Sequence, residues 1–451
     1  MAKPLPDNIL RAAYKAVKAA DGQKTVAARS LSIPITTLKD RYREALERFK
    51  LPAVEGTITG NVVAAINPEE DARLLTARSD ASRYRKAYTE VLKDRADEER
   101  LIRLFTKSIT ALPAIPENHF KAAFKTRFPA AHKSGTTRKP EVPVLLRGDQ
   151  QIGEEITFEE TYGINRYNFD IFQLRLADLE ERTLDILGDH QRADFPTLVV
   201  PYLGDNISGR IHVELQKYGH QHVVDQVYLG ALAESLFLYR LLKFGRWNEI
   251  HVPCVSGNHG RLDKEKESKK YYKNFDYLFT SIMATVLRNV PQIKFHIPQC
   301  LFTVVELAEH RILISHGHEL PPSSLGIPLY SINRASASYQ ELMALSGNER
   351  FQYWFMGHFH RPLELDGSLV NGTMAGISEF GIGRFKPIMP MQRLLGFHPK
   401  WGRAWEYPIR LDKIDPNAAP PQHYRFEHAM TTGDALECFA HQTAAADKDA
   451  A

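Results

Sequence analysis

Five apolar, β-rich runs from residue 141 onward each end in Asp, Asn or His, and this recurrence constrains the fold more than any other feature. The runs are VPVLLRGD, PTLVVPYLGD, NEIHVPCVSGNH, HRILISHGH and FQYWFMGHFH. Helical stretches separate the earlier runs, at FDIFQLRLADLEERTLDILG and VVDQVYLGALAESLFLYRLLKFG. This alternation predicts an α/β domain. Because ligands bind where the strands of such sheets end, we expect the five polar clusters to converge on one site.

The polar side chains at these strand ends are carboxylates, amides and imidazoles, without a thiolate. A lone strand-end His or a lone Gly-Asp pair is more often an ordinary loop or turn residue, but five clusters in a fixed order favour a metal site. This donor set suits borderline to hard divalent ions such as manganese, iron or zinc. Two ions about 3.5–4 Å apart need a bridging carboxylate and about three further ligands each. The candidate ligands are Asp149, Gln151, Asp205, Asn258, His316, His358 and His360.

The order of the motifs carries a family resemblance. They read Gly-Asp at 148–149 and 204–205, Gly-Asn-His at 257–259, His-Gly-His at 316–318 and Gly-His-x-His at 357–360. Over about residues 141–415 this series resembles the calcineurin-like metallophosphoesterase superfamily. The resemblance implies a metallophosphoesterase β-sandwich flanked by helices, within an α/β class. The implied ligands are Asp149 and His360 for one ion, Asn258, His316 and His358 for a second, and Asp205 as the bridge.

The same resemblance implies a hydrolytic mechanism and a catalytic residue. A metal-activated hydroxide would attack phosphorus in line, while His259 would stand beside the phosphate and protonate the leaving oxygen. Two departures from the family pattern bear on this reading. Gln151 stands where the family has His, which is expected either to weaken binding of the first ion or to shift the preference toward manganese or magnesium. Gly260 and Arg261 follow His259 where the family has an acid, so His259 lacks its nearest orienting carboxylate.

We therefore expect two divalent ions, with Mn²⁺ first and iron, zinc or magnesium as alternatives. Downstream, SLVNGTMAGISEFGIGRF has the Asn-Gly and Gly residues of a hairpin. PMQRLLGFHPKWGRAWEYPIRL reads as two further strands around residues 398–400. These strands are expected to complete a two-layered sheet behind the site.

Residues 1–50 have the rhythm of a helix-turn-helix domain. Three short helices are predicted in NILRAAYKAVKAA, TVAARSL and ITTLKDRYREALERF. In such domains an exposed helix supplies contacts to bases and phosphates. A small three-helix packing module with solvated charges is the alternative. The candidate DNA-binding residues are Thr36, Thr37, Lys39, Arg41 and Arg43.

Four further segments flank the two predicted domains. Residues 51–80 read as a linker, and residues 81–112 as a helical connector that packs or self-associates, which makes it a possible homodimer interface. Residues 113–140 form a basic linker interleaved with Phe, which suits either a nucleic-acid backbone or a solvated segment. Residues 416–451 are expected to form a trailing loop and a frayed tail.

The substrate is predicted from where basic residues lie, because a net charge of +4 is too small to identify a polyanionic partner. The insertion RLDKEKESKKYYKNFD directly follows His259 and brings Arg261 and Lys264 toward a substrate phosphate. Together with the helix-turn-helix and the basic linker, this favours DNA, and a nuclease similar to SbcD-type repair nucleases and to phosphoesterases of phages and prophages. One alternative is a phosphatase or phosphodiesterase for a small molecule or a phosphoprotein. Another is a DNA-binding accessory protein whose metal site has decayed through Gln151.

The sequence also predicts a location. No apolar segment approaches the roughly 20 residues needed to span a bilayer, so no membrane association is expected. The cysteines, Cys254, Cys300 and Cys438, lack CxxC spacing, which argues against a disulfide framework or a zinc knuckle. We expect a cytoplasmic protein of a bacterial or phage-infected host cell.

Overall fold

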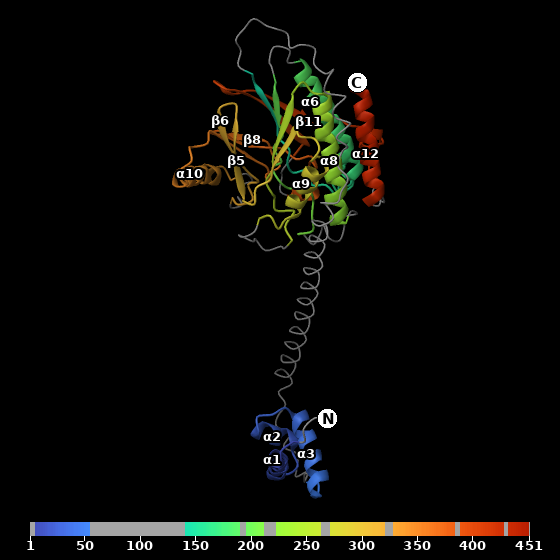
Figure 1. The fold of residues 1–451 in the computed structure, drawn as a ribbon, viewed down its shortest axis with the longest axis vertical. Coiled ribbons are helices and arrows are strands. Elements are labelled where there is room, and N and C mark those ends of the chain that lie inside the picture. Colours follow the sequence, from blue (N-terminus) through green and yellow to red (C-terminus); the bar gives the residue numbers. More distant parts are fainter. Residues whose placement is uncertain are drawn as a thin grey trace. The chain divides into compact units, whose positions relative to one another are not determined.

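The computed structural model describes residues near the N-terminus and most of the chain from residue 140 onward (Figure 1). The described residues are 5–54, 140–189, 195–211, 222–262, 271–320, 328–383, 388–427 and 432–450. The chain divides into two compact units, residues 1–90 and 91–451. The predicted helical connector, nearly all of the two predicted linkers, and Lys264 lie outside the described residues.

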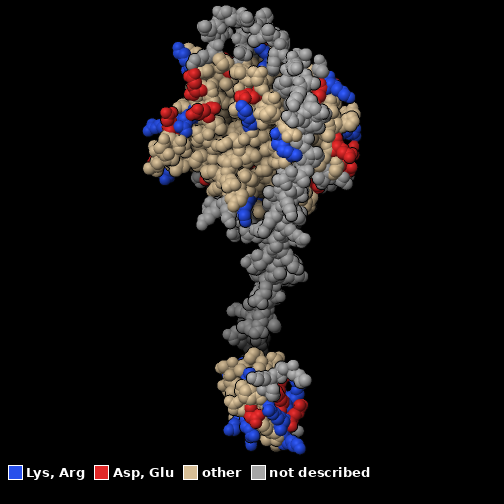
Figure 2. All heavy atoms as spheres, in the orientation of Figure 1, with Lys and Arg blue, Asp and Glu red and all other residues tan. Residues whose placement is uncertain are grey.

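The N-terminal unit contains the three predicted helices, α1 (Asp7–Ala19), α2 (Lys24–Ser30) and α3 (Ile35–Phe49). Small and aromatic side chains form its core, in which Ala27, Leu38 and Tyr42 are buried. The α2–α3 connection turns at Ser32, which has φ of 53°. Figure 2 shows Lys and Arg atoms on this unit with Asp and Glu atoms among them.

The candidate DNA-binding residues differ in exposure along α3. Thr36, Lys39 and Arg43 are exposed, and their spacing places them on one face of the helix. Thr37 and Arg41 are partly buried at the side of that face. Arg43 also pairs with Asp40 at 2.9 Å. Since both side chains of this pair are largely exposed, it contributes little stability and leaves Arg43 accessible.

The first sheet of the large unit has six strands in the order β11-β10-β1-β2-β3-β4. Its parallel part, from β1 to β4, alternates with helices as predicted. The antiparallel β10 and β11 extend the sheet at its other side, where two strands were expected. The strands are β1 (Val142–Leu145), β2 (Thr197–Val199), β3 (Glu249–Pro253), β4 (Ile293–His296), β10 (Met391–His398) and β11 (Gly402–Arg410).

The second sheet has five strands in the order β5-β6-β7-β9-β8, with β6, β7 and β9 parallel. The predicted hairpin exists, but its turn lies earlier in the sequence than expected. It joins β8 to β9 through Asp366 and Gly367, which both have positive φ, whereas the Asn371-Gly372 pair follows the second strand. The strands are β5 (Phe302–Leu307), β6 (His310–Ser315), β7 (Tyr353–Met356), β8 (Leu363–Leu365) and β9 (Ser368–Val370).

The two sheets pack face to face around a shared apolar core. Val144 and Leu395 from the six-stranded sheet meet Ile314, Phe355 and Leu369 from the five-stranded sheet in this core. Helices cover the outer faces, so the unit has four layers, as expected for a β-sandwich flanked by helices (Figure 1). Because alternate residues of each strand point to opposite faces, both sheets have a second buried surface under their helices.

Among the described residues, four helices lie on the side of the six-stranded sheet, where α12 packs on α8, and one helix lies on the five-stranded sheet. The helix α8 is apolar on nearly all sides because it lies between the sheet, α6, α9 and α12. No helix among the described residues is long and apolar enough to cross a bilayer. The helices are α6 (Phe169–Asp189), α8 (Val223–Phe244), α9 (Phe275–Val286), α12 (Thr432–Asp449) and, on the other sheet, α10 (Leu329–Leu345); α11 (Glu379–Gly383) and a short 3-10 helix (Gln422–Tyr424) are minor elements.

The prediction of a frayed C-terminal tail is wrong for the last part of the chain. Residues 432–449 form α12, which packs along α8 with Ala435, Phe439 and Ala446 buried. At its far end Asp447 accepts a hydrogen bond from Tyr239 at 2.6 Å and pairs with Lys243. The Ala-rich composition suggested a tail, but Ala is the strongest helix former and lets the helix lie close to α8.

Replacement of Asp447 by Ala is expected to destabilise the large unit by about 3 kcal/mol, because the Lys243 side chain, with no exposed surface, would lose its carboxylate. Trp fluorescence during urea unfolding measures this, since all four Trp residues lie in this unit. The double variant Lys243→Met/Asp447→Ala should recover much of the loss. Asp449→Ala, at an exposed position, is the matched control. If the midpoint of urea unfolding of Asp447→Ala equalled that of the wild type, α12 would not be docked on α8 as described.

Candidate metal centre

The five polar clusters lie together at one edge of the sandwich. Asp149, Asp205 and Asn258 follow three adjacent parallel strands, β1, β2 and β3. His316 and His358 follow β6 and β7, which are parallel neighbours in the other sheet. Because parallel strands end at the same edge, the fold collects these side chains as predicted from the sequence.

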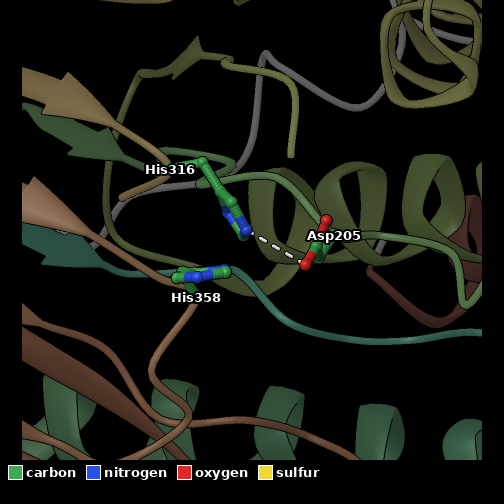
Figure 3. A group of neighbouring side chains, drawn as sticks. All are labelled: Asp205, His316 and His358. Carbon is green, nitrogen blue, oxygen red and sulfur yellow. Dashed lines mark ion pairs between the residues drawn. The ribbon is translucent and has the colours of Figure 1, made fainter. Parts of the chain in front are cut away.

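One donor group surrounds the imidazole of His316 (Figure 3). The ligand atoms of Asp205, His316 and His358 all lie within 4.8 Å of one another. His316 Nε2 is 3.0 Å from Asp205 Oδ2 and 3.2 Å from Asn258 Oδ1. The four predicted ligands of this group are therefore adjacent, and their atoms are of the kinds that bind divalent cations.

The orientation of His316 fits a bound cation. Its Nδ1 donates to the backbone carbonyl of Leu203 at 2.7 Å, which leaves Nε2 as the atom that faces Asp205 and Asn258. A ring nitrogen and two acceptor oxygens meeting in a buried space require a cation or a proton between them. Burial alone would lower the pKa of His316, but the Asp205 carboxylate raises it to about 10. The site thus favours positive charge.

A second donor group adjoins the first. The Asp149 carboxylate accepts from the His358 backbone N–H at 2.9 Å and lies 3.3 Å from His360 Nε2. The Gln151 amide is 3.1 Å from the same His360 nitrogen. Since the two ends of an amide can exchange by rotation, Gln151 can offer its oxygen at this place. The three residues predicted as ligands of the first ion, Asp149, Gln151 and His360, therefore lie next to one another.

His358 and His360 serve different groups although they are two residues apart. His358 points to Asp205 and His316, and His360 to Asp149 and Gln151. Simple strand alternation does not explain this, because both residues have positive φ, 67° and 59°.

Left-handed backbone is shared by much of the site. Besides the two imidazoles, it occurs at Asp149, Gln151 and Asp205, with φ of 49°, 49° and 51°. Non-glycine residues rarely adopt such angles, at a cost of order 1–3 kcal/mol each, and they concentrate at functional sites. Backbone strain at five candidate ligands is thus independent support for a site whose side-chain directions matter.

Two glycines of the motifs allow close approach. A Cβ at Gly257 would lie 2.1 Å from Asp205 Oδ1, and a Cβ at Gly357 would lie 2.5 Å from Asp149 Oδ2. Any side chain at these positions would displace a carboxylate of the site. The glycines before Asn258 and His358 are therefore explained by packing against ligands from neighbouring strands.

His259 lies beside the candidate metal ligands, and its side chain is not one of them. Its backbone N–H donates to Asp205 Oδ1 at 2.8 Å, and its Nδ1 donates to the Ser208 carbonyl at 2.8 Å. A backbone carbonyl thus orients the ring, in place of the carboxylate that the sequence lacks. With Nδ1 engaged in this way, Nε2 is the nitrogen suited to exchange a proton with substrate.

Arg261 folds back on the loop that holds Asn258. Its side-chain Nε donates to the Asn258 carbonyl at 3.0 Å, so it supports that loop. Burial lowers its pKa, and the Asp205 carboxylate opposes this effect, which reflects its position near the centre.

Asp276, at the start of α9, is a functional residue that the sequence reading missed. Its buried carboxylate accepts from the backbone N–H of Asp205 at 2.9 Å and of Gly257 at 2.7 Å, and so joins the loops after β2 and β3. Burial and the nearby Asp205 charge raise its pKa to about 6. The signal was present, because Asn274 two residues earlier caps α9 and accepts from the Asp276 N–H.

Glu154 is a second missed residue. It follows Gln151 in the loop after β1, and burial raises its pKa while the charges of His259 and His360 lower it. Burial has the larger effect, so the pKa of Glu154 lies above its usual value and its charged form is disfavoured.

No family model matches the sequence, and no curated protein matches it. Among solved structures, a single mutant of Vps29 from Entamoeba histolytica aligns with 14% identity and a TM-score of 0.25, over 59% of this chain and 98% of its own. A conserved uncharacterized protein from Streptococcus pneumoniae, described as a predicted phosphoesterase, aligns with 12% identity and a TM-score of 0.23, over 60% and 99%. Vps29 from Chaetomium thermophilum aligns with 11% identity and a TM-score of 0.25, over 56% and 84%. At TM-scores this low, the likeness assigns no function to this chain.

Proposed function

We propose that this protein is a metal-dependent phosphoesterase that hydrolyses phosphodiester bonds, with DNA as its substrate. The observation that supports it most is the pair of adjoining donor groups, one around His316 and one around His360, at the strand ends of both sheets. The residues of these two groups would hold two divalent ions, and Asp205 is the residue proposed as a ligand of both. Their oxygen and imidazole donors suit manganese, with iron, zinc and magnesium as alternatives.

When bound, two such ions would activate water and neutralise the charge of a phosphoryl group. The residues of this chain supply the remaining functions. Asp205 fixes the neighbouring loop through its contact with the His259 N–H. His259, held by Ser208, is placed to protonate the leaving oxygen, and Arg261 contributes positive charge on the same side.

The choice of DNA is supported by the N-terminal unit. Its third helix exposes Thr36, Lys39 and Arg43 on one face, a polar and basic surface that suits phosphate and base contacts. DNA binding through several such contacts loses affinity steeply as salt rises.

Hydrolysis of bis-p-nitrophenyl phosphate and of linear duplex and single-stranded DNA, each with added manganese, tests this proposal. We expect both kinds of substrate to be cleaved, with activity lost on chelation and restored by manganese. Cleavage of the small diester alone, with DNA binding that does not depend on salt, would overturn the DNA assignment and favour a phosphatase or small-molecule phosphodiesterase. Absence of both metal binding and turnover would overturn the enzymatic assignment and favour a DNA-binding accessory protein.

A further inference from the structure

The outward face of α10 carries large apolar side chains where a surface helix normally carries polar ones. Its inward face is buried, with Ile332 and Met343 packed against the five-stranded sheet. On the opposite side, Tyr330 is 78% exposed and Leu345 is 79% exposed. The helix, at the edge of the large unit (Figure 1), therefore exposes a large apolar side chain near each of its ends.

The exposed residues form a straight row. Tyr330, Arg334, Ala337, Glu341 and Leu345 are all exposed, and steps of three or four residues separate them. At 3.6 residues per turn, this spacing places them on one face, opposite Ile332 and Met343. We call this row the outer stripe.

The outer stripe is complementary to the outer stripe of a second, antiparallel copy of the same helix. Arg334 lies as many residues before the midpoint of Ala337 and Ser338 as Glu341 lies after it, and the same holds for Tyr330 and Leu345. Two antiparallel copies related by a two-fold axis at this midpoint would pair each Arg334 with a Glu341 and each Tyr330 with a Leu345. The small residues at the crossing, Ala337 and Ser338, allow the helix axes to approach closely.

The charges favour a second copy of the same helix as the occupant. Arg334 and Glu341 are exposed, and no ion pair within the described part of the chain involves either of them. One helix thus supplies both signs of charge at matching distances from its centre, flanked by apolar ends. A two-fold pair satisfies both charges twice and covers both apolar ends.

We propose that α10 forms a two-fold antiparallel interface between two copies of this chain. The interface is separate from the predicted helical connector at residues 81–112 and contributes no metal ligand, so it is independent of the proposed activity. Because a single helix pair is a small interface, the expected dissociation constant is on the order of 10 µM.

Sedimentation velocity of the full-length protein, from roughly 1 to 100 µM, tests the proposal over the range set by that affinity. The wild type should shift from the 51.3 kDa monomer toward twice that mass. Arg334→Glu or Glu341→Arg alone should raise the dissociation constant at least about tenfold, because each sets like charges opposite one another at two places. The double variant Arg334→Glu/Glu341→Arg should return it toward the wild-type value.

Glu349→Arg changes an exposed charge beyond the end of α10 and should leave association unchanged. A wild type that stays monomeric across the range would overturn the proposal. So would a dimer that tolerates both single reversals, as a dimer through residues 81–112 would, or a double variant that remains as weak as the single ones.

Discussion

Replacement of Asp205 by Ala is expected to remove both bound metal and hydrolysis. Its carboxylate, 1% exposed, is within 3.0 Å of His316 Nε2 and also receives the His259 N–H. Loss of an outer partner of a metal ligand already costs ten- to hundredfold in affinity or activity. We therefore expect turnover to fall more than about 100-fold. Elemental analysis after dialysis, together with the rate of diester hydrolysis, measures both effects.

Asp205→Asn is the matched variant, because it keeps an oxygen for the His259 N–H while removing the charge. We expect it to retain the fold, as judged by circular dichroism, and to lose most of the metal. Full activity of Asp205→Ala would show that the assignment of the metal centre is wrong.

Replacement of His259 by Ala is expected to lower turnover by about 10²- to 10⁴-fold and to leave metal content unchanged. The ring contacts the Ser208 carbonyl, and its removal leaves the ligand side chains in place. Because p-nitrophenolate leaves with less need of a proton than a sugar alkoxide, the loss should be larger for DNA than for bis-p-nitrophenyl phosphate. Single-turnover rates for the two substrates measure this difference.

A matched His259→Asn variant separates orientation from proton transfer, since its amide can still donate a hydrogen bond but cannot act as an acid at neutral pH. It should be as slow as His259→Ala on DNA. Equal rates for wild type and both variants would remove His259 from the mechanism, and loss of metal in either variant would make it a structural residue.

The strands and the convergence of the site could be predicted from sequence because both depend on local pattern. Runs such as HRILIS read as strands, and parallel strands necessarily end at one edge. The docking of α12 could not be read in this way. The apolar positions of that segment are few and small, and burial of Phe439 depends on α8, some 200 residues earlier in the chain.

Within the site, the kinds of ligand could be predicted but their support could not. The backbone carbonyl of Ser208 accepts a hydrogen bond from the His259 ring. The carboxylate of Asp276 accepts one from the Asp205 backbone N–H. Each contact orients a residue of the site and involves a main-chain atom. The Ser208 contact leaves no trace in residue identity, because every residue has a backbone carbonyl. The positive φ of His358 could not be predicted either. Glycine is the residue that usually indicates this conformation in a sequence, and at His358 the surrounding structure imposes it.

The sandwich divides the chemistry of the site between its two sheets. The carboxylate and amide groups of the site, on Asp149, Gln151, Asp205 and Asn258, follow strands of the six-stranded sheet, whereas the imidazoles of His316, His358 and His360 follow strands of the five-stranded sheet. An ion that binds both kinds of donor would crosslink the sheets at their open edge. Sliding or separation of the sheets would then require the ion to lose one class of its ligands, so metal occupancy and sheet packing would be thermodynamically coupled.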